Sequence, residues 1–240
     1  MMKNRVAVLG AATLAILGAH CAKSEGTRVA EDPAAEMLSN ATMRLTIPTE
    51  NVGVDVRGSG RFLTAHFARG TTAHAFARLP QSAERPFEVE SAHDASFSIR
   101  VTTKGAVAAK PIVDRGLVRY EGALGTNTEI MHRMTREGTE DFAKFAEAPA
   151  KAELHYHVEL GASVAHLRQL GDSVEFLDAG GAPRLRMDSP YGIDAKGERI
   201  AVHTRVEGCA VDTNPAAPWG RDMVSPGSQA CAITVSWDNG

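Results

Sequence analysis

Two histidines separated by a single residue form the arrangement in this sequence that most resembles a metal site. His155 and His157 lie in the segment from Glu153 to Leu160, where apolar and polar residues alternate. In an extended strand, residues two apart project from the same face, with backbones about 7 Å apart. This spacing can chelate zinc or copper if a third ligand is supplied.

The third ligand has several candidates, and the histidine pair also has a simpler interpretation. The possible donors are His132, His166, His203, Glu153 and Glu159. Leu154, Tyr156 and Val158 have the opposite parity and predict a buried face, so the histidines are expected on the solvated face. The alternative to a metal site is therefore a pair of hydrated surface histidines.

Two aromatic residues are candidates for binding a ligand such as a sugar. Trp219 lies in a segment rich in proline and glycine, and Tyr191 follows Pro190. An aromatic ring with an apolar body and a polar edge suits such a contact when it is exposed. The alternative for Trp219 is that it closes one end of a hydrophobic core.

Other catalytic patterns are not evident, and the overall charge excludes one class of partner. No Gly-x-Ser-x-Gly motif occurs, so we expect no catalytic residue and no cofactor, with a metal-dependent enzyme as the alternative. The formal net charge is −3 and the basic residues are scattered, so a nucleic-acid partner is not expected.

The elements that would position these residues are mainly strands. With 240 residues, 43% of them hydrophobic and 23% charged, the chain can bury a substantial core. Apolar and polar residues alternate in many short segments, which predicts strands with one wet face. These segments are 43–47, 52–56, 87–89, 97–99, 154–160, 174–176, 185–187, 200–206 and 233–237.

The turns between these segments favour antiparallel pairing. Asp178 to Gly181 and Asp194 to Gly197 each place an aspartate before a glycine, which is typical of hairpin loops. No long amphipathic helix is evident, and the best candidates for short helices are 73–79 and 140–147. We therefore predict an all-β fold, an antiparallel β-sandwich over residues 41–240, with a boundary near 110–120 if it forms two lobes.

The N-terminal segment indicates export. Lys3 and Arg5 precede an uncharged apolar run from Val6 to Ala19, which is typical of a secretory signal peptide over residues 1–21. The run is shorter than the ~20 residues that a membrane-spanning helix needs. Residues 22–40 are small, charged and poor in large apolar residues, which predicts a flexible tether.

The three cysteines fit the same compartment. Cys21 follows Leu17, Gly18, Ala19 and His20, a run similar to a lipobox, so lipid modification of Cys21 and simple cleavage with release are the alternatives. Contact with a membrane is expected only through such an anchor. Cys209 and Cys231 are the natural disulfide pair beyond the cytoplasm, and two buried free thiols are the alternative.

The order of features from residue 120 onward resembles a known kind of module. The features are Tyr120 to Ala123, Gly125 to Glu129, Glu137 to Asp141, the strand Glu153 to Leu160, Val174 to Asp178, Leu185, Ser189 to Tyr191, Asp194 and Trp237. Residues 120–240 resemble the exported β-sandwich region that precedes repeat arrays in large bacterial surface and secreted proteins. These include proteins with Rhs or YD repeats and similar myxobacterial exported proteins.

This resemblance implies a structural module with no catalytic residues. Two departures from the pattern are that no repeat array follows residue 240 and that the segment from Cys209 to Cys231 is not general among such modules. The expected function is an exported structural or adhesive module, either anchored at the cell envelope or released. The expected partner is an envelope or extracellular protein or a glycan, and the remaining alternative class is a carbohydrate-binding module.

Overall fold

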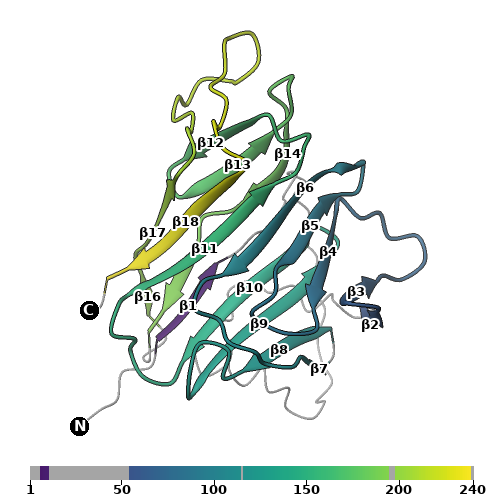
Figure 1. Ribbon diagram of the computed structural model, residues 1–240, viewed down its shortest axis with the longest axis vertical. Coiled ribbons are helices and arrows are strands. Elements are labelled where there is room, and N and C mark those ends of the chain that lie inside the picture. Colours follow the sequence, from purple (N-terminus) through teal and green to yellow (C-terminus); the bar gives the residue numbers. More distant parts are fainter. Residues whose placement is uncertain (1–5, 11–53, 115, 195–197, 239–240) are drawn as a thin grey trace, which may run out of the picture.

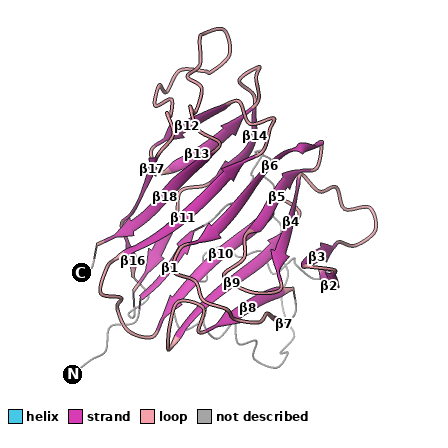
Figure 2. Cartoon of the chain, in the orientation of Figure 1, coloured by secondary structure: helices cyan, strands magenta, loops and turns pink. Residues whose placement is uncertain are grey.

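The structure of the protein is a computed structural model that describes residues 6–10, 54–114, 116–194 and 198–238. Figure 2 shows that all the regular structure in these ranges is strand. The expected all-β class is therefore confirmed. No helix that could cross a membrane occurs among the residues described.

The described residues form 18 strands. In the first half these are β1 (Val6–Gly10), β2 (Asp55–Ser59), β3 (Phe62–His66), β4 (Ala75–Pro80), β5 (Phe87–Ser91), β6 (Asp94–Thr103), β7 (Ile112–Asp114), β8 (Leu117–Glu121) and β9 (Thr128–Thr135). The others are β10 (Gly138–Phe145), β11 (Glu153–Leu160), β12 (His166–Leu170), β13 (Ser173–Leu177), β14 (Pro183–Met187), β15 (Tyr191–Ile193), β16 (Arg199–Ile200), β17 (Val202–Glu207) and β18 (Ala230–Trp237).

These strands form three antiparallel sheets. An eight-stranded sheet has the order β17-β18-β11-β6-β5-β4-β3-β2, and a seven-stranded sheet has the order β16-β15-β1-β10-β9-β8-β7. A three-stranded sheet, β12-β13-β14, lies at the upper end of the molecule in Figure 1. The strands of the two large sheets run along the same diagonal in that view, as in aligned sandwiches.

The hydrophobic core lies between the eight-stranded sheet and the other two sheets. Its larger cluster combines side chains from all three, including Phe97 of β6, Tyr120 of β8 and Phe176 of β13. A smaller cluster joins Phe145 of β10 to Trp237 of β18, whose ring centroids are 6.0 Å apart. The arrangement is therefore a sandwich with one layer shared by two sheets, as the alternating segments predicted.

The alternation of residues in β18 sets which side chains enter the core. Cys231, Ile233, Val235 and Trp237 share one parity and are all buried. β18 lies between β17 and β11, so both of its edges are hydrogen-bonded. The expected role of this last strand in the core is confirmed.

The two predicted hairpins both form. Asp178 accepts hydrogen bonds at Oδ1 from the backbone N–H groups of Gly180 and Ala182, each at 2.9 Å, and β13 pairs with β14 across this turn. Gly181 has φ of +81°, a conformation that side chains disfavour. β15 pairs with β16, and Asp194 and Glu198 are hydrogen-bonded to each other between these two strands.

The two short helices suggested by the sequence are wrong. The segment 73–79 contributes to β4, and the segment 140–147 contributes to β10. Most residues of β10 are buried, including the polar Thr139, Glu140 and Asp141, so the alternation that marks a half-exposed strand is missing there. Tertiary burial on both faces therefore concealed the strand.

Several sequence predictions fall wholly or partly outside the described residues. The tether 22–40, Cys21 and the strand expected at 43–47 all lie there, and the signal-peptide segment is described only at Val6–Gly10. Both large sheets contain strands from before and after residues 110–120. Residues from both sides of this segment also share one core. The boundary suggested near those residues therefore does not coincide with a division between sheets.

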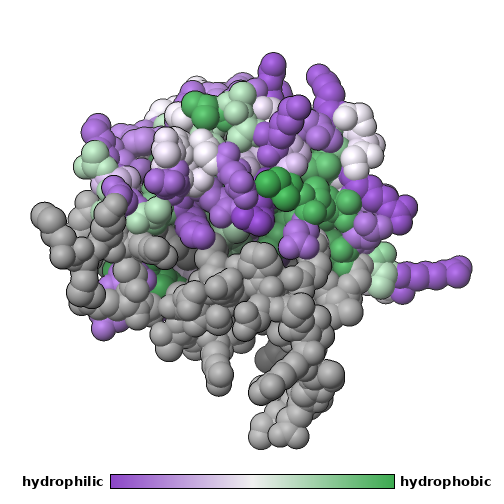
Figure 3. All heavy atoms as spheres, turned by 90° about the horizontal axis from the view of Figure 1, so that it is seen from below, coloured by the Kyte–Doolittle hydropathy of each residue, from purple (hydrophilic) through white to green (hydrophobic). Residues whose placement is uncertain are grey.

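The described part of the face drawn in Figure 3 is mainly hydrophilic. Hydrophobic residues appear among the hydrophilic ones and are most extensive right of the centre of the view. The exposed large hydrophobic residues among those described are Phe76, Val107, Ile112, Val113, Trp219 and Val224. Single exposed hydrophobic residues of this kind are normal on a protein surface.

Candidate functional site: the disulfide-closed loop and its surroundings

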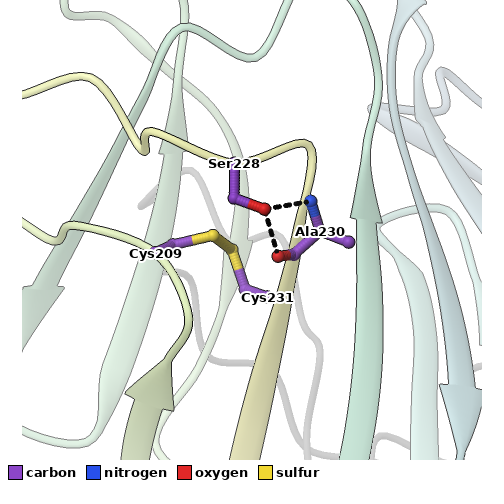
Figure 4. Close-up of a disulfide and its surroundings, with 4 residues drawn as sticks. All are labelled: Cys209, Ser228, Ala230 and Cys231. Atoms are coloured by element: carbon purple, nitrogen blue, oxygen red, sulfur yellow. Dashed lines mark hydrogen bonds between the residues drawn. A yellow bond between two sulfur atoms is a disulfide. The ribbon is translucent and has the colours of Figure 1, made fainter.

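A disulfide closes the long loop that joins β17 to β18. Cys209 and Cys231 are bonded, with Cα atoms 5.4 Å apart and a sequence separation of 22. Figure 4 shows the bond beside Ser228, whose Oγ donates to the carbonyl oxygen of Ala230 at 2.8 Å. By restricting the unfolded chain, a loop of this length stabilises a fold by about 3 kcal/mol. The predicted cysteine pair is confirmed.

A buried arginine fixes the loop from one side. Arg168 of β12 donates through Nη2 to the carbonyl oxygens of Pro215 and Ala216, at 2.9 and 3.0 Å. Its Nη1 lies 3.1 Å from Oε2 of Glu175 on β13, and both side chains are about nine-tenths buried. A guanidinium carries several donors in a rigid plane, so a single residue can hold successive carbonyl groups in place.

An aspartate fixes the same loop from within. The backbone of Asp212 hydrogen-bonds to Leu167 and Gln169 of β12, each at 2.9 Å. Its carboxylate accepts from the N–H of Asn214 at 2.9 Å and pairs with Arg221. Burial acts to raise the pKa of Asp212, but Arg221 and the Asn214 amide outweigh it and hold the pKa below its usual value.

Trp219 lies on this fixed loop and is exposed. Its exposed fraction is 61%, whereas the preceding Pro218 is buried against the turn at Gly181. The alternative in which Trp219 closes the end of the core is therefore wrong, and Trp237 is the tryptophan of the core. An indole held in water by a braced backbone is a surface that a ligand can cover.

Tyr191 belongs to another part of the molecule. It lies in β15 of the seven-stranded sheet, where the guanidinium of Arg199 lies 5.3 Å from the centre of its ring. Its hydroxyl donates to Oε1 of Glu140 at 3.3 Å. Burial, the Glu140 carboxylate and this hydrogen bond raise the pKa of Tyr191 above its usual value. Tyr191 thus makes its own intramolecular contacts within the seven-stranded sheet.

His155 and His157 lie on β11 as the alternation predicted. Leu154, Val158 and Leu160 are buried, whereas His155 is exposed. The ring of His155 contacts Glu153, with 3.2 Å between Nε2 and Oε1, and its Nδ1 lies 3.0 Å from Oγ1 of Thr234. Both ring nitrogens therefore already have partners.

The other proposed ligands are not gathered around this pair. His166 contacts the carbonyl oxygen of Val224, His203 lies near Asp172, and Glu159 pairs with Arg100. Among the residues that the structure describes, no three histidine, cysteine or carboxylate side chains are grouped so as to hold a metal ion. The histidine pair is left as a surface feature of β11.

A buried histidine and aspartate form a polar pair that the sequence did not identify as a unit. His132 of β9 and Asp141 of β10 lie opposite each other in the ladder, with Nδ1 and Oδ1 2.6 Å apart. Thr139 donates to the same carboxylate oxygen at 3.2 Å, and the ring of Phe87 meets the imidazole edge-on. The sequence indicates His132 only as a possible metal ligand. A hairpin centred on 136–137 is the signal that would have placed it against Asp141.

A small cavity lies beside this pair. It has a volume of about 50 Å³ and lies between apolar residues such as Phe87, Ile99 and Phe176, with Asp141 and Tyr156 at its polar side. Burial, together with the Asp141 carboxylate, raises the pKa of Tyr156 above its usual value. Binding pockets for small molecules usually enclose ~300–1,000 Å³, so this space is a packing gap.

The fold and the site define the class of this protein as an antiparallel β-sandwich with a disulfide-closed, internally braced loop. No protein family, no curated protein and no solved structure matches the chain. The resemblance of residues 120–240 to the modules that precede repeat arrays stays a prediction.

Proposed function

We propose that this protein is an exported, non-enzymatic structural or adhesive module that works at the bacterial cell envelope or outside the cell. The observation that supports it is the Cys209–Cys231 disulfide, because such bonds persist in oxidising compartments and are rare in the cytosol. The apolar N-terminal run with its preceding basic residues supplies the means of export.

Thiol trapping in intact cells tests this proposal. The full chain is expressed with its N-terminus, cells are treated with an alkylating reagent, and the fractions are analysed by mass spectrometry. We expect the protein beyond the inner membrane, with Cys209 and Cys231 alkylated only after reduction. A variant with Lys3 and Arg5 replaced by glutamate is the matched control and should stay inside with free thiols. Recovery of the unaltered chain in the cytoplasm overturns the proposal.

The mode of retention depends on Cys21. If the protein is anchored, the cysteine carries lipid after cleavage, and the residues from 22 to 40 separate the sandwich from the membrane. Labelling with a fatty-acid probe, compared between the unaltered chain and Cys21→Ser, separates anchoring from release. Label on the unaltered chain alone supports an anchored protein, and release of both proteins supports a secreted one.

A second function, binding of a glycan, is favoured by one observation. Trp219 is 61% exposed although its loop is fixed by a disulfide, by Arg168 and by Asp212. Ordering a flexible loop on binding costs conformational entropy, so a loop that is already fixed keeps more of the contact energy. An indole face suits the apolar face of a sugar ring.

Tryptophan fluorescence provides the test. The chain has two tryptophans, one exposed and one buried in the core, so an external quencher should act mainly on Trp219. A glycan that binds should protect this emission from quenching. Trp219→Phe keeps a stacking ring and should retain part of the affinity, whereas Trp219→Ala should lose it at least about tenfold. Equal binding by both variants removes the glycan function.

A further inference from the structure

The N-terminal strand occupies a position that export would empty. β1, Val6–Gly10, lies inside the seven-stranded sheet, between β10 and β15. It pairs along five residues with β10, from Phe145 to Asp141, and along three residues with β15, from Ile193 to Tyr191. The same residues begin the apolar run that the sequence identifies as a leader.

A single segment cannot serve both roles at once. A leader is held in the export machinery and then cut away, whereas a strand must stay paired with its neighbours. Cleavage before Cys21 would remove Val6–Gly10 from the chain. The backbone groups of β10 and β15 that face β1 would then have no strand partner between them, and unpaired backbone groups at a sheet edge favour the addition of a strand.

Loss of β1 would leave a gap between β10 and β15, and the residues on these two strands define what could fill it. Ala143 and Phe145, which lie opposite Val8 and Val6, are buried in the cluster that contains Trp237. Gly192 lies opposite Val8 on the other side, and a Cβ there would lie 2.5 Å from Cγ1 of Ile200. An incoming strand therefore needs apolar residues at two alternate positions, antiparallel to β10.

One side-chain contact spans the gap on the other face. Tyr191 of β15 reaches Glu140 of β10, although β1 lies between these two strands in the sheet. Glu140 is in turn paired with Arg133 of β9. This contact links the two sides of the gap independently of β1, so they have a means of staying in register when the leader is gone.

We propose that the exported protein binds an extended segment of a partner protein in the gap between β10 and β15, by strand addition. The inference rests on the export proposed above. The partner is a protein segment with apolar residues at alternate positions, because main-chain hydrogen bonds provide affinity in this mode and alternate side chains provide specificity.

The first step of the test identifies the N-terminus of the protein as it exists after export. The full chain is expressed, the exported form is purified, and its intact mass shows whether Val6–Gly10 are still present. A retained segment overturns the strand-addition proposal while export stands. If the protein is recovered only from the cytoplasm, export is contradicted. If that cytoplasmic protein also retains Val6–Gly10, strand addition is contradicted as well.

The second step measures binding to the exported form. The probe is a fluorescent peptide of residues 5–11, and the control is the same peptide with Val8→Pro, which lacks a backbone donor and does not fit an interior strand. We expect saturable binding that is at least tenfold weaker for the proline peptide. Amide hydrogen exchange in β10 and β15 should slow only with the unaltered peptide.

Two results of this second step would overturn the proposal. One is equal binding of both peptides, because strand addition requires the backbone donor. The other is an exported form whose β10 and β15 amides are already protected without peptide, because the gap would then be covered. Both results leave the exported location intact, so they are distinct from a failure of the proposed function.

Discussion

His132 and Asp141 face each other across the ladder of β9 and β10, and Nδ1 of the imidazole lies 2.6 Å from a carboxylate oxygen. Both residues are buried. The rings of Tyr120 and Phe87 meet the imidazole of His132 edge-on. Buried polar groups of this kind stabilise a fold only while each has its partner. The pair is therefore a point where a single substitution has a large effect.

Asp141→Ala should lower the free energy of unfolding by about 2–4 kcal/mol, because it leaves a buried imidazole without its acceptor. Asp141→Asn keeps an oxygen at this position and should cost less. Urea unfolding followed by tryptophan fluorescence measures both. Glu159→Ala is a matched control, since its pair with Arg100 is exposed and should contribute less than about 1 kcal/mol. Equal losses for Asp141→Ala and Glu159→Ala would contradict a structural role for the buried pair.

Removing the disulfide should destabilise the protein by about 3 kcal/mol, because the unfolded chain regains the freedom of the loop. Cys209→Ser with Cys231→Ser is the variant, and its unfolding is compared with that of the reduced and oxidised unaltered protein. Reduction should have no effect on the double variant. Cys21→Ser is the control that keeps the bond. Identical stability of the oxidised protein and the double variant would contradict the prediction.

Acid should weaken the Trp219 loop through Asp212. The pKa of this carboxyl in the folded protein lies below its usual value of 3.8, so the unfolded chain takes up its proton first as the pH falls. Its contribution is present above pH 3.8 and is lost as the pH falls through the lower folded pKa. Asp212→Asn should flatten this part of the curve of stability against pH. If the slope of stability against pH is the same in Asp212→Asn and in the unaltered protein, the predicted role of Asp212 is contradicted.

Asp188 provides a comparison of opposite sign. Burial raises its pKa in the folded protein, although Arg186 acts to lower it. The folded chain therefore takes up this proton more readily than the unfolded chain. The free energy of unfolding increases as the pH falls through the pKa of Asp188 in the folded protein. Asp188→Asn should remove that gain, so the two variants should change the acid side of the curve in opposite directions.

A tight backbone approach at Gly161 predicts a cost for the smallest side chain. A Cβ at this position would lie 2.5 Å from the backbone carbonyl oxygen of Ser98, which belongs to β6 and cannot easily move. Gly161→Ala should lower the melting temperature by several degrees, which corresponds to about 1–3 kcal/mol of overpacking. Gly58→Ala is the control, because its nearest neighbour is a side-chain atom at 3.7 Å. Similar melting temperatures for both variants would contradict the predicted clash.

The sequence predicted the sandwich where strands are half-exposed and missed strands where they are not. β11 and β18 alternate plainly, so their buried faces were predicted residue by residue. β10 carries buried Thr139, Glu140 and Asp141, whose partners on β9 only the hairpin register supplies. β1 is apolar without alternation, so its sequence indicates a leader rather than a strand.

The candidate sites divide in the same way. The cysteine pair could be predicted because the compartment and the count left one combination. The exposure of Trp219 could not, because it depends on Arg168 reaching carbonyl groups some 46 to 48 residues away in sequence. Contacts at such separations have no local signature.

The position of β18 has a consequence for how the chain comes to be folded. This strand, residues 230–237, lies between β17 and β11, and β11 in turn joins it to β6, which lies far earlier along the chain. The eight-stranded sheet therefore cannot be completed before residues 230–237 have been made. Pairing of residues so distant along the chain is slow, so we expect β11 to keep one edge unpaired until late in folding.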